Sequence, residues 1–303
     1  MKTRKSFKHY LPYYVLGLPG IIYLIINNYM PFYGLQIAFK NFNYRKGISG
    51  SPWCGFDNFK FLFATDNAWV ITRNTVVYNI CWLFLGNFVA VFLAIFLNEV
   101  RSKSAKKVYQ SLIMLPYLIS TVIVAYLVYA FLSPENGMIN AILKTFGLQP
   151  IQWYMKKEYW PFILTIVFLW MRIGFSTVIY LSTIVGFGKE YYEAASLDGA
   201  GKWKQVKTIT IPMLKPVIIM MLTLGMGQVF RSDFGLFYQV PRNQGLLYPV
   251  TDTIDTFIFR ALMKTGDVGM SSAAAFYQSV VCFVTIMIFN AIVRKISKED
   301  AIF

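Results

Sequence analysis

Charged residues are scarce in this sequence. Asp, Glu, Lys and Arg make up 14% of the 303 residues, whereas soluble domains carry roughly 25%. Hydrophobic residues make up 56%, and the mean hydropathy is +0.50. This composition excludes an ordinary soluble domain and predicts a membrane protein.

Histidine and cysteine are also rare. The single histidine, His9, lies in a basic segment, which excludes a Ser-His-Asp triad or a histidine-based metal site within this chain. Cys54, Cys81 and Cys282 are odd in number and unrelated in spacing, so they favour neither a disulfide framework nor a metal site. The G-x-x-x-x-G-K-S/T motif of phosphate-binding loops is missing. We therefore expect no catalytic residue, no metal and no cofactor in this chain itself.

Long apolar runs dominate what is present. A bilayer-crossing helix needs roughly 20 apolar residues. The runs that meet this length are 13–39, 76–97, 108–132, 160–187, 213–238 and 271–292. Pro19, Pro31 and the pair Asn27-Asn28 are expected to bend or interrupt the first run. The fold class predicted is an all-α membrane protein with about six transmembrane helices.

The basic residues give an orientation. The formal net charge is +15, and basic residues flank the apolar runs instead of forming the single face that nucleic acid would need. Their excess is larger on the side that holds both termini and the loop between the fourth and fifth runs. The positive-inside rule then predicts cytoplasmic tails at 1–12 and 295–303, a transmembrane domain at 13–294 and a cytoplasmic loop at 187–215. We expect the lipid bilayer as a partner and no nucleic acid.

The loop at 187–215 has a distinctive core. Glu193-Ala194-Ala195 favours a short helix, and Gly199 and Gly201 are expected to end it. A second short helix is expected through 203–208, and Pro212 then begins the next helix. The residues singled out in this loop are Glu193, Ala194, Ala195, Asp198, Gly199 and Pro212.

This spacing resembles the EAA loop of ABC-importer permeases. The shared features are Glu-Ala-Ala, a glycine six residues after the glutamate, and an ending with Ile209, Ile211 and Pro212. The resemblance implies that 187–215 is a coupling loop, which docks on a cytoplasmic ATPase and transmits its closure to the membrane helices. The simpler alternative is a solvated loop with ordinary helix punctuation.

Two segments expected outside the membrane, 34–59 and 230–260, are rich in aromatic and hydrogen-bonding side chains. Aromatic rings can stack on the apolar faces of sugars, and the candidates are Trp53, Tyr44, Tyr238 and Tyr248. For any one ring, the aromatic belt of a membrane interface is the favoured alternative. The phrases G-L-Q-I-A-F-K, G-S-P-W and F-R-S-D-F-G-L-F-Y-Q-V resemble the oligosaccharide (LplB-like) branch of the maltose-permease superfamily.

That resemblance implies a type I ABC importer permease in the cell membrane. It also implies a second, homologous permease subunit, two ATPase subunits that bind ATP and Mg, and an extracellular sugar-binding protein. Three alternatives remain. A secondary sugar transporter favours inverted repeats and intramembrane acids. A membrane enzyme would need gathered acids, for which Asp233, Asp252 and Asp255 are weak candidates. An ABC permease for a non-sugar solute is the third.

Charges within the runs mark a candidate substrate path. Arg172 is expected near mid-membrane, where an arginine costs at least ~2.5 kcal/mol and normally faces the bundle interior. It serves either the substrate path or a pair with a partner subunit. Gln228 and Arg231 are expected on one helix face, with Asp233 close enough to pair with Arg231 or to bind a sugar hydroxyl. The path candidates are Arg172, Gln228, Arg231, Asp233, Tyr238 and Trp53.

Four further amides are expected within the runs. Polar side chains in transmembrane helices often form hydrogen bonds between helices. We expect that role for Asn79, Asn87, Gln278 and Asn290.

Overall fold

The computed structural model describes residues 7–60 and 66–296. Half of the predicted tail at 1–12 and most of the predicted tail at 295–303 therefore fall outside the described residues. The chain divides into two compact units, one made of residues 1–65 and 258–277 and the other of residues 66–257 and 278–303.

In the first unit, α1 (Phe7–Leu24) continues through Pro12 and Pro19, so Pro19, which was expected to bend or interrupt the run, does not interrupt it. A π-helix at Ile25–Tyr29 and a 3-10 helix at Met30–Phe39 follow, which places the change of helix type at the asparagine pair and Pro31, as expected. Proline has no amide hydrogen, and its ring disfavours a regular α-helix at that point.

The rest of this unit is short and compact. It contains α2 (Gly47–Gly50), a 3-10 helix at Asp57–Phe59 and an antiparallel bridge between Lys40 and Trp53. Ala38, Phe59 and Ala273 form its buried core, the last from α15 (Val268–Ile296).

The second unit is built on two long helices, α4 (Asp66–Glu99) and α8 (Trp160–Val185), which pack along each other. Between them in sequence lie α5 (Lys103–Met114), a 3-10 helix at Leu115–Leu118, α6 (Thr121–Leu132) and α7 (Met138–Thr145). Two short 3-10 helices, Trp153–Met155 and Lys157–Tyr159, lead into α8.

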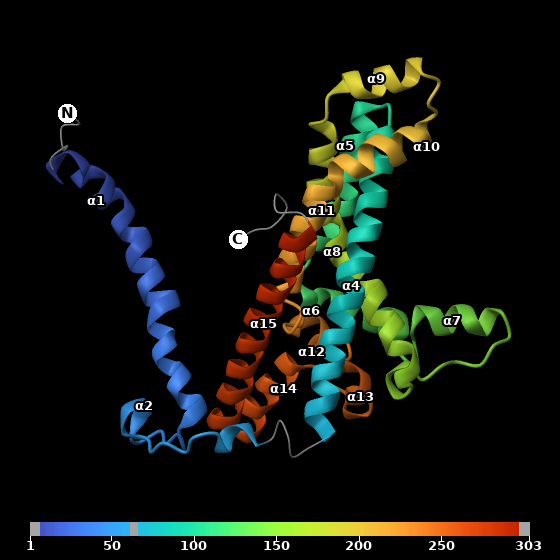
Figure 1. Ribbon diagram of the computed structural model, residues 1–303. Helices are drawn as coiled ribbons and strands as arrows, with labels where there is room; N and C mark the ends of the chain where they lie inside the picture. The colour runs from blue at the N-terminus through green and yellow to red at the C-terminus, as the bar shows by residue number, and fades with distance from the viewer. Residues whose placement is uncertain (1–6, 61–65, 297–303) are drawn as a thin grey trace. The chain divides into compact units, whose positions relative to one another are not determined.

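After α8 come α9 (Lys189–Leu197), α10 (Lys202–Gln205), a π-helix at Val206–Thr210 and α11 (Ile211–Met226). The chain then forms α12 (Phe234–Gln239), a 3-10 helix at Gly245–Leu247, α13 (Tyr248–Thr251), α14 (Ile254–Arg260) and a π-helix at Ala261–Thr265. Figure 1 shows α9 and α10 at one end of α4, and α12 and α13 at the opposite end.

Five of the described helical segments are long and apolar enough to cross a membrane, and a bent pair raises the number to six. The prediction of about six spans is confirmed, but two of them differ in form. The run at 108–132 is a broken pair that turns by 96° between Leu118 and Thr121. Pro116 lies in the 3-10 turn before the bend, and the Ser120 hydroxyl accepts a hydrogen bond from the Val122 amide and caps the next helix.

The run at 213–238 is also not one helix. α11 ends at Met226, and α12 begins anew at Phe234 with Asp233 as its cap. Gln228 and Arg231 therefore lie in a turn, where the Arg231 amide donates to the Gln228 carbonyl at 2.8 Å. The expectation that both share a helix face is wrong.

The separate helix expected at 203–208 is wrong too. Helix runs from Lys202 to Met226 without a gap, and a π-turn precedes Pro212. Proline cannot donate the usual backbone bond and crowds the preceding turn, and a local π-turn accommodates both effects.

Candidate functional site

The loop between α8 and α11 is held in shape by the backbone turn that its sequence predicts. Gly199 adopts a left-handed conformation with φ of +77°. Its amide donates to the Ser196 carbonyl at 3.1 Å, and the Ala200 amide donates to the Ala195 carbonyl at 2.8 Å. This pair of bonds is a Schellman motif, which satisfies the last carbonyls of α9.

Side chains then brace the loop from within. Gln205 is buried, and its amide donates to the Ser196 hydroxyl at 2.8 Å and to the Ala200 carbonyl at 3.0 Å. The Tyr192 and Thr210 hydroxyls are hydrogen-bonded at 3.1 Å, which ties α9 to the start of the membrane helix. These bonds connect α9 directly to the helix that follows.

The outer surface of the loop exposes large apolar side chains. Leu197 is 90% exposed and Trp203 is 72% exposed. Leu197 also lines a hollow of about 610 Å³, whose other lining residues are Lys189, Tyr192, Glu193, Ser196, Lys202 and Gln205. Lys202 also bridges to Glu99 at 3.1 Å, which connects the loop to the end of α4. Of the singled-out residues, Ala195 is half-buried and the other five are exposed: Glu193, Ala194, Asp198, Gly199 and Pro212.

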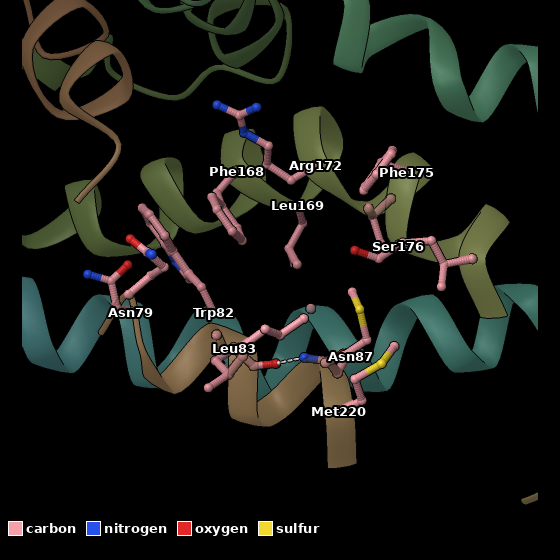
Figure 2. Close-up of a pocket in the computed structure, with 17 residues that line it drawn as sticks. Asn79, Trp82, Leu83, Asn87, Phe168, Leu169, Arg172, Phe175, Ser176 and Met220 are labelled. Carbon is pink, nitrogen blue, oxygen red and sulfur yellow. Dashed lines mark hydrogen bonds between the residues drawn. The ribbon is translucent and has the colours of Figure 1, made fainter. Parts of the chain in front are cut away.

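A cavity of about 590 Å³ lies between α4, α8 and α11 (Figure 2), and we name it the α4–α8–α11 cavity. Most of its lining is apolar, including Trp82, Phe168 and Met220. Its polar lining residues are Asn79, Asn87, Arg172, Ser176 and Gln228. The path candidates Arg172 and Gln228 thus meet at one cavity.

Two of its amides also hold helices together. The Asn79 amide donates to the Val229 carbonyl at 3.1 Å, and the Asn87 carbonyl oxygen is hydrogen-bonded to the Tyr180 hydroxyl. In the same unit, the Gln278 amide donates to the Phe230 carbonyl at 2.7 Å. The expected role between helices is confirmed for Asn87, which joins α4 to α8, whereas Asn79 and Gln278 bind carbonyls of the turn that follows α11. Asn290 is buried.

Arg172 is paired within its own chain. Its guanidinium forms an ion pair with Asp233, whose other carboxylate oxygen accepts from the Leu236 amide at 3.1 Å and caps α12. The Arg172 and Asp233 side chains are 40% and 19% exposed. Figure 2 shows the guanidinium extending away from Asn87, so the middle of the cavity is left uncharged. Asp233 pairs with Arg172 and not with Arg231, which corrects the expected pair.

The remaining path candidates lie elsewhere. Tyr238 lines a second cavity of about 360 Å³, the α6–α12 cavity, which shares no lining residue with the first. Trp53 belongs to the other unit, where the Lys40 ammonium lies 4.8 Å from its ring centroid.

Sequence reasoning missed most of the α6–α12 cavity. Its lining residues are Val122, Ala125, Tyr126, Tyr129, Tyr238, Gln239, Arg242 and Asn243. The Arg242 guanidinium stacks 4.0 Å from the centroid of the Tyr129 ring. The sequence Pro-Arg-Asn-Gln-Gly predicts a turn at this point, because these residue types favour turns. It does not predict which helix packs against the turn.

The turn that carries Arg242 is unusual. Arg242 and Asn243 both have positive φ, at 56° and 50°, which is uncommon for residues other than glycine. The Tyr154 hydroxyl lies 3.5 Å from the Val240 carbonyl just before this turn. Burial raises the pKa of Tyr154 to about 12, although the Arg242 charge acts in the opposite direction. Tyr154 therefore stays protonated at neutral pH and remains a hydrogen-bond donor.

Known proteins match this chain over almost its whole length. The permease protein YteP of the polygalacturonan/rhamnogalacturonan transport system of Bacillus subtilis (strain 168) is 32% identical, over 94% of this chain and 88% of that protein. Protein LplB of the same organism is 29% identical, over 94% and 89%. A bacterial ABC transporter involved in the import of the acidic polysaccharide alginate has a solved chain that is 32% identical, with a TM-score of 0.88 over 96% of this chain and 97% of that one.

A further solved structure shows a bacterial alginate ABC transporter in complex with an alginate pentasaccharide-bound periplasmic protein. Its matching chain is 31% identical with a TM-score of 0.88, over 98% of this chain and 99% of that one. Residues 86–298 match the family model described as the binding-protein-dependent transport system inner membrane component. The chain is therefore a multi-pass inner-membrane permease of the ABC importer type rather than an enzyme, and it belongs to the family of binding-protein-dependent transport system inner membrane components.

Proposed function

We propose that this chain is the permease of an importer for oligosaccharides, and that these are acidic. The observation that carries this is the α4–α8–α11 cavity, which combines aromatic and apolar walls with a few amide side chains and with Arg172. Ligand pockets usually have this composition, with a few polar groups that fix the orientation of the ligand. The names of YteP and of the alginate transporters support the acidic class.

The proposed path passes the Arg172–Asp233 pair. Gln228 lines the cavity beside Arg172, and exposed Arg231 lies in the same turn that leads to Asp233. A guanidinium presents a planar fork of donors that matches a carboxylate. A sugar carboxylate that competes with Asp233 for Arg172 would loosen the cap of α12. Binding would thereby change the packing at this end of the molecule.

The proposed assembly has a second, homologous permease, two ATPase subunits that bind ATP and Mg, and an extracellular sugar-binding protein. Residues 13–294 form the transmembrane domain, and both termini and the coupling loop at 187–215 face the cytoplasm. The exposed Leu197 and Trp203 are suited to docking the ATPase. ATP-driven closure then shifts the population between outward and inward packings, because the ATPase binds the two packings with different affinity.

The test is affinity purification of this chain from its native membrane, with identification of the co-purifying subunits and of any bound glycan. Reconstituted complex is then assayed for ATP-dependent uptake of labelled oligogalacturonates, of oligoalginates and of neutral maltooligosaccharides. Faster uptake of the uronate chains supports the proposal. Uptake of the neutral chains alone refutes the acidic class, and uptake of none of these sugars favours the alternative of a non-sugar solute.

A further inference from the structure

The α6–α12 cavity has a different chemistry from the α4–α8–α11 cavity. Tyrosine side chains surround it, and Arg242, Gln239 and Asn243 supply polar groups. At about 360 Å³ it falls at the lower end of the size range of small-molecule pockets. Tyrosine rings can pack on the apolar face of a sugar while their hydroxyls stay hydrated.

The arginine in this cavity carries an uncompensated charge. Within residues 7–60 and 66–296, no acidic side chain pairs with Arg242. Arg172, in contrast, is neutralised by Asp233. Arg242 is exposed and therefore solvated in the absence of a ligand, but it is positioned to accept an anion.

The stacking on Tyr129 also orients the guanidinium. The central carbon of the guanidinium lies over the Tyr129 ring, 4.0 Å from its centroid, which is within the range of a cation–π contact. A cation–π contact does not use the N–H donors, and a guanidinium with free donors can bind a carboxylate through two parallel bonds. Stacking thus fixes the side chain without using its donors.

The backbone presents these groups at some conformational cost. The amides of Arg242 and Asn243 donate to the Gln239 and Tyr238 carbonyls at 3.0 and 3.1 Å, which holds the two left-handed residues at the end of α12. The Asn243 side chain accepts from the Tyr248 hydroxyl at 2.9 Å. Strained residues that the surrounding bonds hold in place tend to occur at binding sites.

From these features we propose that the α6–α12 cavity binds one uronate unit of a glycan chain, as a subsite separate from the α4–α8–α11 cavity. Arg242 binds the carboxylate, Tyr126 and Tyr238 pack on the ring, and Gln239 bonds its hydroxyls. The inference rests on the proposed function, and it adds a second contact that only chains long enough to occupy both cavities can make. In the proposed orientation this cavity lies on the external side, because α12 is at the opposite end of α4 from α9.

The test uses the whole reconstituted complex and uronate chains of defined length, from disaccharide to hexasaccharide. Arg242→Asn removes the guanidinium and keeps a residue that tolerates the left-handed conformation. Tyr126→Ala removes a ring that is 69% exposed and lies outside the core. The matched control is Phe146→Ala, which removes a ring that is 77% exposed and lines neither cavity.

We expect Arg242→Asn to raise the KM for hexasaccharide uptake about tenfold, since hydrogen bonds to charged groups have roughly this effect on affinity. The KM for the disaccharide should change far less, because the proposal has a short chain occupy only one of the two cavities at a time. Tyr126→Ala should show the same length dependence, whereas the control should match the wild type at every length. Hexasaccharides whose carboxylates are reduced to alcohols should lose the dependence on Arg242.

Three results overturn the inference. Unchanged KM for both variants at all lengths removes the subsite. Equal losses at all lengths assign a structural role to the turn. Weaker docking of the extracellular binding protein without glycan assigns the cavity to a protein contact. If the wild type takes up no uronate chain, the proposed substrate class is wrong and the inference fails with it. If the wild type takes up uronate chains and Arg242→Asn has the same KM at every length, only the inference fails.

Discussion

The ion pair between Arg172 and Asp233 can be tested by a double-mutant cycle. The variants are Arg172→Leu, Asp233→Asn and the double variant. Asparagine caps helices about as well as aspartate, so Asp233→Asn keeps the hydrogen bond to the Leu236 amide and removes only the charge. Each single variant then leaves one charge without its partner.

The burial of the pair sets the size of the effect. Breaking a fully buried pair costs 3–5 kcal/mol, whereas an exposed pair contributes about 0–1 kcal/mol. With side chains that are 40% and 19% exposed, solvent screens part of the interaction, and we expect each single change to cost about 1–3 kcal/mol. The double variant should recover most of this loss, because it leaves no charge unpaired. If the Arg172 charge only destabilises the protein, Arg172→Leu alone will leave the stability unchanged or raise it.

The assay is thermal unfolding of the purified complex. Size-exclusion chromatography with fluorescence detection measures how much folded complex remains after heating. A loss of 1 kcal/mol lowers the Tm of a domain of this size by about 2–4 °C. Both single variants should therefore lose several degrees, with the double variant closer to the wild type. Additive losses would refute the pairing. Uptake measured on the same samples tests the proposed substrate path independently of stability. The double variant should remain assembled but lose uronate uptake.

Other predictions concern the turn, the packing and the orientation. Gly199→Pro should leave the complex assembled but uncouple ATP hydrolysis from uptake, because proline cannot adopt a φ of +77° and has no amide to donate. The control is Gly201→Ala, which should keep hydrolysis coupled to uptake because Gly201 has a φ of −64° and open space around it. Equal behaviour of the two variants would contradict the docking role. Gly174→Ala should destabilise the chain by about 1–3 kcal/mol in thermal unfolding, because its Cβ would overlap the Ile113 carbonyl on the packed α5. Gly86→Ala is the control, since its Cβ meets only an ordinary contact at 3.9 Å, and an unaffected Gly174 variant would refute the close approach. In a background without Cys54, single cysteines should react with an impermeant thiol reagent outside intact cells only at the proposed external positions, and the reverse pattern would overturn the orientation. The external positions are Tyr44 and Gln244, and the cytoplasmic positions are Ser104 and Leu197.

The sequence by itself determined the class of protein and the turn in the loop at 187–215. Apolar runs of membrane length follow directly from composition, because a helix in lipid must satisfy its own backbone and present apolar side chains. The Glu-Ala-Ala and Gly199 spacing predicted a helix and a left-handed stop, and both are present within a few residues. These features depend on neighbours in sequence, which is why local reasoning was sufficient.

Tertiary structure decided how the charged side chains are used. Arg172 and Asp233 are 61 residues apart, and no local pattern indicated that Asp233 would start a new helix and face Arg172 instead of Arg231. Continuous hydropathy through 213–238 concealed the end of α11 at Met226, since a run of apolar residues does not show where a helix stops inside it. The stacking of Arg242 on Tyr129 likewise depends on α6 lying beside α12. Such pairings are set by which helix faces come together, and that is decided by residues far apart in the sequence.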